Sequence, residues 1–177
     1  MISRRGLVAG LGALCARPDF AFAEGAASAA SRARPVQPPR DASLLKLTDA
    51  EGQTRPLSDW AGSVLVLPLW GPWCVPCQRE LPTLSRLAAQ LGPEGPTVLP
   101  LAFDWRGPNA VRKFYTRLGI DNLPVLMGDG ENLKAVLDTE LLPSVFVIGR
   151  DSHTLSLVSG EAVWDDAPTL SWLTSLL

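Results

Sequence analysis

Cysteine and histidine are scarce in this chain, which has three cysteines and one histidine among its 177 residues. A structural zinc site normally takes four Cys or His ligands, so we expect no zinc centre. Positive charge is not in excess either, because 16 Lys and Arg stand against 18 Asp and Glu. The chain therefore lacks the basic footprint of a protein whose main partner is nucleic acid.

The apolar stretch near the N-terminus is too short for a membrane span. GLVAGLGALCA has 11 residues, whereas a spanning helix needs about 20. It follows the cationic start MISRR and precedes AFA, the order of a secretory signal peptide. We expect cleavage after Ala23 and a periplasmic protein exported by the Sec or the twin-arginine route. The alternative is an uncleaved N-terminus that anchors the protein to the inner membrane.

Cleavage after residue 23 removes Cys15 and leaves Cys74 and Cys77 as the only cysteines. An exported chain with just this pair is located where disulfides form. Residues 24–40 are rich in Pro, Ala and Ser, which predicts a linker, flexible at first and then extended. The folded domain is predicted to cover residues 41–177.

Apolar periodicity alternates between strand and helix along this domain. VLVLPL reads as a buried strand, and the helical spacing of leucines predicts a helix over residues 76–91. Further helices are predicted after Pro108 and near the C-terminus, with a strand hairpin between them. The pattern indicates an α/β fold in which helices flank both faces of a central mixed β-sheet. Pro68 and Pro100 lie inside predicted strands, where we expect bulges or edge exposure.

The two cysteines of CVPC lie where the predicted strand passes into the predicted helix. Unpaired N–H groups at a helix N-terminus favour a thiolate at Cys74, and Cys77 lies one turn further on. Pro76 suits the first helical turn, which needs no N–H from it. A structural staple closing so small a loop would restrict the unfolded chain little. We therefore predict a redox couple, while a two-thiolate copper(I) site stays open.

WCVPCQRELP resembles the W-C-x-P-C-x-x-E-x-P block of TlpA-like and ResA-like thioredoxin-fold proteins, closest to TlpA. LLPSVFVIGRDS and GEAVWDD extend the resemblance over most of residues 43–177. The resemblance implies a thioredoxin-like fold and a thiol–disulfide oxidoreductase with no cofactor beyond its redox-active disulfide. It makes Cys74 the exposed nucleophile and Cys77 the buried resolving cysteine.

The same resemblance assigns the residues that shape the site. Pro143 is expected in the cis form beside the disulfide, and the backbone of Leu142 is expected to pair with an extended substrate. Trp73 is expected to flank the disulfide and Trp70 to pack beneath the active-site loop. The other tryptophans, among them Trp105 and Trp164, are expected to be packing residues.

Glu80 matches the acid of the motif and lies three residues after Cys77. A partly buried carboxylate there has a raised pKa and can carry a proton for Cys77; the alternative is a solvated glutamate on the helix surface. Classical thioredoxins carry a buried Asp in the preceding strand, and TlpA-like proteins usually carry Asn. Pro68 stands at that position and cannot transfer a proton, so Glu80 is the leading candidate.

The resemblance implies a monomeric reductant of client proteins with cysteine pairs, such as a metallochaperone, an oxidase subunit or apocytochrome c. Its electrons would come from a membrane thiol-reducing donor, and its role would lie in cytochrome c or copper/cytochrome oxidase assembly. Two alternatives stay open, a disulfide-forming oxidant and a copper(I)-binding assembly factor. A peroxiredoxin-type peroxidase has a related fold, but no T-x-x-C nucleophile element precedes the helix.

Overall fold

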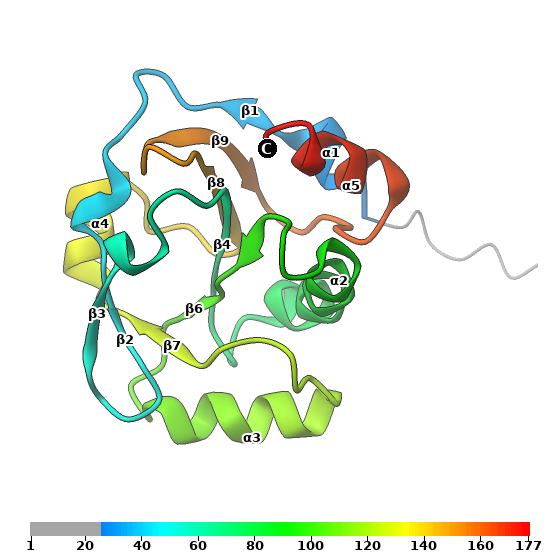
Figure 1. Cartoon of the computed structure of the whole chain (residues 1–177). Coiled ribbons are helices and arrows are strands. Elements are labelled where there is room, and N and C mark those ends of the chain that lie inside the picture. The colour runs from blue at the N-terminus through cyan, green and yellow to red at the C-terminus, as the bar shows by residue number, and fades with distance from the viewer. Residues whose placement is uncertain (1–25) are drawn as a thin grey trace, which may run out of the picture.

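The computed structural model describes residues 26–177, so the predicted signal peptide lies outside the described residues. A mixed β-sheet runs through the molecule in the order β1-β9-β8-β4-β6-β7-β2-β3, with β5 beside β4 (Figure 1). Its strands are β1 (Arg34–Pro35), β2 (Lys46–Thr48), β3 (Thr54–Pro56), β4 (Leu65–Trp70), β5 (Thr97–Val98), β6 (Leu101–Ala102), β7 (Leu126–Gly128), β8 (Ser144–Ile148) and β9 (Thr154–Ser159).

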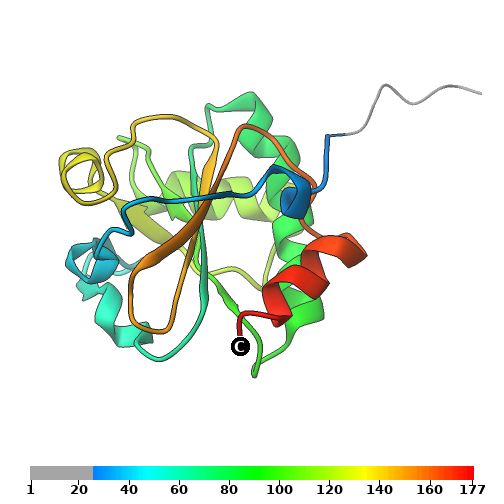
Figure 2. The same cartoon turned by 90° about the horizontal axis from the view of Figure 1, so that it is seen from above.

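The helices are α1 (Ala29–Arg32), α2 (Val75–Leu91), α3 (Pro108–Leu118), α4 (Gly130–Leu137) and α5 (Ala167–Thr174), with short 3-10 helices η1 (Ala42–Leu44) and η2 (Leu57–Trp60). Seen from above, α4 (yellow) lies on one side of the strands, and α2 (green) and α5 (red) lie on the other (Figure 2). Within residues 26–177, no helix combines the length and hydropathy that a membrane crossing needs.

The central strand β4 is buried on both faces and divides the core in two. Val66 and Trp70 face a cluster built with α1, α2, α3 and α5. Leu67 and Leu69 face a second cluster built with α4 and the two 3-10 helices. This division follows from the alternation of side chains along a strand, and it confirms the predicted mixed sheet flanked by helices on both faces.

Pro68 lies inside β4, away from the edges of the sheet, so the expectation of edge exposure was wrong there, whereas Pro100 lies between β5 and β6 and belongs to neither strand. Both are buried, and β4 pairs with β8 on one side and with β5 and β6 on the other. The register of β4 with β5 and β6 places Pro68 opposite Pro100. Proline has no N–H for a ladder bond, and the ladder is interrupted between β5 and β6 at this point. The sheet thus tolerates both prolines by placing them at one break.

The predicted linker is part of the fold from residue 28 onward, and the predicted domain start at residue 41 is too late. Residues 26–36, here called the N-terminal strap, include α1 and β1. Ala29 is fully buried, and its N–H donates to the Val163 carbonyl at 2.9 Å. Strand β1 pairs antiparallel with β9. The small side chains that suggested a flexible linker instead let the strap pack closely.

Candidate active site

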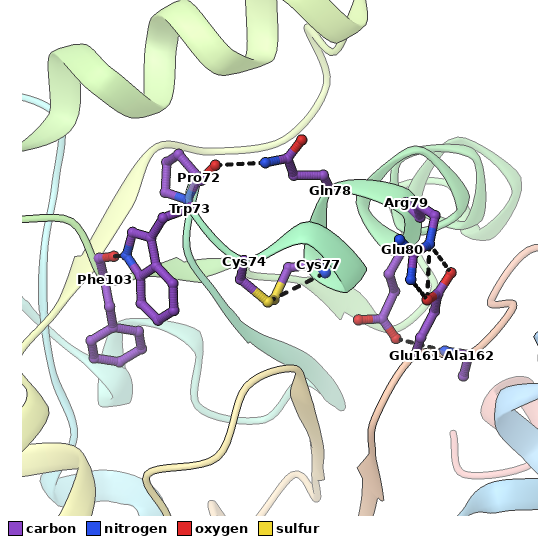
Figure 3. Close-up of a disulfide and its surroundings, with 10 residues drawn as sticks. All are labelled: Pro72, Trp73, Cys74, Cys77, Gln78, Arg79, Glu80, Phe103, Glu161 and Ala162. Carbon is purple, nitrogen blue, oxygen red and sulfur yellow. Dashed lines mark hydrogen bonds and ion pairs between the residues drawn. A yellow bond between two sulfur atoms is a disulfide. The ribbon is translucent and has the colours of Figure 1, made fainter.

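A tight loop leads from the end of β4 to the first turn of α2. Cys74 is the N-cap of α2, which begins at Val75, and Pro76 lies in its first turn. Cys74 and Cys77 form a disulfide with their Cα atoms 5.3 Å apart (Figure 3). The N–H of Cys77 donates to the Cys74 sulfur at 3.4 Å. In the dithiol form this N–H and the helix N-terminus would favour a Cys74 thiolate.

Cys74 is less exposed than the resemblance implied. Its residue exposure is 6%, against 1% for Cys77, so the expectation of an exposed nucleophile is wrong for the disulfide form. The reason is that a capping side chain turns back over the first helical turn, where the disulfide then holds it. The order of exposure nevertheless agrees with the expectation, since Cys77 is the more deeply buried of the two.

The indole of Trp73 is an exposed wall beside the disulfide. Trp73 is 59% exposed, and its Nε1 donates to the Phe103 carbonyl at 2.9 Å (Figure 3). A Cβ atom at Gly71 would come within 2.8 Å of this indole and 2.9 Å of the same carbonyl. Glycine at position 71 therefore allows the loop to hold the Trp73 indole against the backbone of Phe103.

Trp70 lies at the base of the same loop, at the end of β4. It is almost fully buried, and its ring stacks on Tyr115 with the centroids 5.6 Å apart. Phe114 contacts it in a tilted arrangement at 5.3 Å. The aromatic packing ties the active-site loop to α3. It also leaves the buried Nε1 of Trp70 without a hydrogen-bond partner among the described residues.

The peptide bond between Leu142 and Pro143 is cis, as the resemblance implied. Ser144 pairs with Leu69 of β4, so Pro143 stands level with the start of the active-site loop. The Pro143 carbonyl accepts from the N–H of Gly160 at 2.9 Å. No hydrogen bond within the described residues uses the backbone of Leu142. That backbone is available to an incoming extended chain.

Glu80 is buried rather than solvated, which excludes the surface alternative. Its residue exposure is 2%, and its Oε1 accepts from Trp164 Nε1 at 2.7 Å and from the Ala162 N–H at 3.2 Å. Burial raises the pKa of Glu80 to about 7, although the two hydrogen bonds pull the pKa down in part. Glu80 lies one turn beyond Cys77 on α2, so a buried carboxyl group with a raised pKa follows the couple on the same helix.

Sequence reasoning missed the second role of Trp164. It is fully buried, as expected of a packing residue, but its indole N–H also holds the Glu80 carboxylate. Only its place in GEAVWDD, before the last helix, hinted at a link to the site. The packing expectation was wrong for Trp105, which is 93% exposed in the loop between β6 and α3.

A groove of about 260 Å³ runs along the side of Trp73 that faces α4. It is lined by Trp73, Phe103, Gly130, Leu133, Thr139, Glu140 and Leu142. The lining is mainly apolar, and Leu142 connects it to the cis-proline loop. Within residues 26–177 no group of three or more His, Cys, Asp or Glu is arranged to hold a metal ion.

The fold and the helix-capping disulfide beside a cis-proline define the class: a thioredoxin-fold thiol–disulfide oxidoreductase. The chain belongs to the AhpC/TSA family, whose model matches residues 39–154. The thiol-disulfide oxidoreductase ResA of Bacillus anthracis is 29% identical over 122 residues, which are 69% of each chain.

Solved structures show the same fold. A secreted thiol-disulfide isomerase from Corynebacterium glutamicum aligns with a TM-score of 0.67 at 20% identity, over 82% of this chain and 91% of that one. A DsbF homologue from Corynebacterium diphtheriae aligns with a TM-score of 0.63 at 18% identity, over 79% and 91%.

Proposed function

We propose that this protein is a periplasmic reductant that opens disulfide bonds of specific client proteins during cytochrome c or copper/cytochrome oxidase assembly. The observation that carries the proposal is the Cys74–Cys77 couple at the N-terminus of α2, beside the cis-proline at residue 143. The predicted signal peptide supports the location. The apolar groove at Trp73 and the unpaired backbone of Leu142 support a protein substrate.

The reaction begins with both cysteines reduced. The Cys74 thiolate attacks one sulfur of the client disulfide, that disulfide breaks, and the other client sulfur leaves as a thiolate. The Cys77 thiolate then attacks the Cys74 sulfur, which releases the second client thiolate and forms the Cys74–Cys77 disulfide. Two electrons pass to the client, and a membrane dithiol donor returns two electrons to the couple.

Glu80 would handle the proton of Cys77 in the second step. Cys77 must lose its proton before it attacks, and its burial denies that proton direct access to water. A carboxyl group with a pKa of about 7 is matched to proton exchange near neutral pH. Since Pro68 has no titratable group, the buried glutamate is the residue next to the couple that can take this role.

Trapping of the mixed disulfide tests the mechanism. Reduced Cys77→Ser protein is mixed with a peptide that contains one disulfide, and the products are separated without reductant and weighed by mass spectrometry. We expect a stable adduct through Cys74, and no adduct from Cys74→Ser protein. Turnover of the Cys77→Ser variant at the wild-type rate would rule out the dithiol mechanism.

The midpoint potential of the couple tests the direction of electron flow. It is measured by Trp fluorescence in glutathione and dithiothreitol buffers on protein that begins at Glu24. We expect a value close to that of thioredoxin, roughly −270 mV. A value near that of strong oxidants, about −120 mV, would instead make the protein a disulfide-forming oxidant.

A further inference from the structure

A second hollow, of about 480 Å³, lies on the α3 side of the active-site loop. It is lined by Pro72 of the loop, by residues of α3 and by Arg106, which precedes that helix. The groove beside Trp73 is lined by a different set of residues. The active-site loop therefore lies between two hollows. The groove at Trp73 is assigned to the client backbone, whereas the α3 hollow has no role in the proposed dithiol mechanism.

The α3 hollow is basic, although the whole chain carries a formal charge of −2. Arg106, Lys113 and Arg117 line it, and among the described residues that line it none is acidic. Arg106 is paired with Asp104, which leaves Lys113 and Arg117 to determine the charge of the hollow. These two lie four residues apart on one face of α3, an arrangement that costs helix stability when both charges are alike.

The Arg117 side chain is held in place. Its guanidinium lies over the ring of Phe114, 4.8 Å from the centroid, and Phe114 is itself buried against Trp70. A cation–π contact of this kind restricts a side chain that would otherwise move freely in water. This contact positions the positive charge of Arg117 at the hollow.

The hollow is also coupled to the disulfide through Pro72. Pro72 stands two residues before Cys74, and its carbonyl accepts from Gln78 Nε2 at 2.8 Å (Figure 3). Gln78 follows Cys77 directly on α2. Pro72 is thus hydrogen-bonded to the helix that carries the couple, and it connects the hollow to the loop that leads to Cys74.

We propose that the α3 hollow binds carboxylates of an acidic client segment that lies next to the disulfide being reduced. The inference rests on the proposed function, because the occupant is part of the same client. Charge complementarity identifies the occupant, since carboxylates neutralise Lys113 and Arg117 in a hollow that supplies no acid of its own. The client would then contact the loop on both sides, with extended backbone near Leu142 and acidic side chains over α3.

Binding is tested directly with two peptides whose cysteines are replaced by serine, one with three Asp and one with three Asn beside the former disulfide. Titration into oxidised wild-type protein is followed by calorimetry at low salt. We expect the Asp peptide to bind at least fivefold more tightly, and we expect added salt to remove the difference. The affinity of the Lys113→Ala/Arg117→Ala variant for the Asp peptide should fall roughly threefold for each charge removed.

The matched control is Arg150→Ala. Arg150 is exposed and follows β8, whose Ile148 pairs with Leu65 at the end of β4 away from the couple. Equal binding of the two peptides to wild-type protein would overturn the proposal. The proposal would also be overturned if the Arg150→Ala variant lost as much affinity for the Asp peptide as the Lys113→Ala/Arg117→Ala variant does. That result would mean that the overall electrostatic field of the protein, and not the hollow, attracts the peptide. If oxidised glutathione displaced the Asp peptide and this displacement depended on Lys113 and Arg117, the proposal would be overturned in favour of a small acidic ligand.

Reduction of the matching disulfide peptides separates this proposal from the proposed function. Wild-type protein should reduce both peptides, the Asp form faster, and the Lys113→Ala/Arg117→Ala variant should reduce the Asn form at the wild-type rate. If wild-type protein reduced neither peptide, the proposed function would be refuted. The binding experiment would still decide whether the hollow binds carboxylates. An unchanged rate for the Asn peptide would also show that the variant is folded.

Discussion

Replacement of Glu80 by Gln should change how the stability of the protein depends on pH. The folded pKa of Glu80, about 7, is higher than its ordinary value of 4.5, because burial penalises the charged form. Between these two values the folded protein binds more protons at this site than the unfolded chain does. The contribution of Glu80 to the free energy of unfolding should therefore fall as pH rises from about 4.5 to about 7.

The size of the effect follows from the same two values. A pKa difference of one corresponds to about 1.4 kcal/mol, so a rise of about 2.5 corresponds to roughly 3 kcal/mol. Glu80→Gln does not titrate, and its amide oxygen can still accept from Trp164 and Ala162. The free energy of unfolding of the variant, relative to that of wild type, should thus increase by about 3 kcal/mol between pH 4.5 and pH 8.

Urea unfolding of the oxidised proteins, followed by Trp fluorescence, measures this difference at each pH. The disulfide form is used so that neither cysteine titrates. Glu94→Gln, an exposed carboxylate in the loop after α2, is the control, and its difference from wild type should stay within about 0.5 kcal/mol throughout. If the difference between Glu80→Gln and wild type were the same at pH 4.5 and pH 8, the argument from burial would be refuted.

Three further substitutions test contacts around the site. Trp164→Phe removes the N–H that stabilises the Glu80 carboxylate, so the pKa of Glu80 should rise and the pH profile of disulfide reduction should move to higher pH; an unmoved profile would contradict a role for this bond. Gly71→Ala would place a methyl group against the Trp73 indole, and we expect a loss of about 1–3 kcal/mol in stability together with altered Trp fluorescence. Ala29→Asp puts a charge at a fully buried position of the strap and should lower the free energy of unfolding by at least about 2 kcal/mol, whereas a flexible linker would show no change.

The sequence predicts the local features of the site well. The strand before Cys74 and the proline after it place the couple at the start of a helix, because these signals act within a few residues. The cis bond at Pro143 was expected only from the resemblance, since the physical preference of an X–Pro bond in a folded protein is trans.

Contacts between distant residues could not be predicted in the same way. The bond from Trp164 to Glu80 joins residues 84 positions apart, and no local pattern encodes that distance. The opposition of Pro68 and Pro100 depends on strand register, which only the assembled sheet determines. The strap was missed because a segment rich in Ala, Ser and Pro is equally compatible with a linker and with close packing.

The two outermost strands of the sheet, β1 and β3, end in the same dipeptide. β1 consists of Arg34 and Pro35, and β3 ends with Arg55 and Pro56. Open sheet edges attract other extended chains, and short strands that carry charge and proline discourage such pairing. The proposed function would bring these edges close to extended segments of client proteins. Under the proposed function, edges that discourage pairing would direct an extended client to the backbone of Leu142 and away from the margins of the sheet.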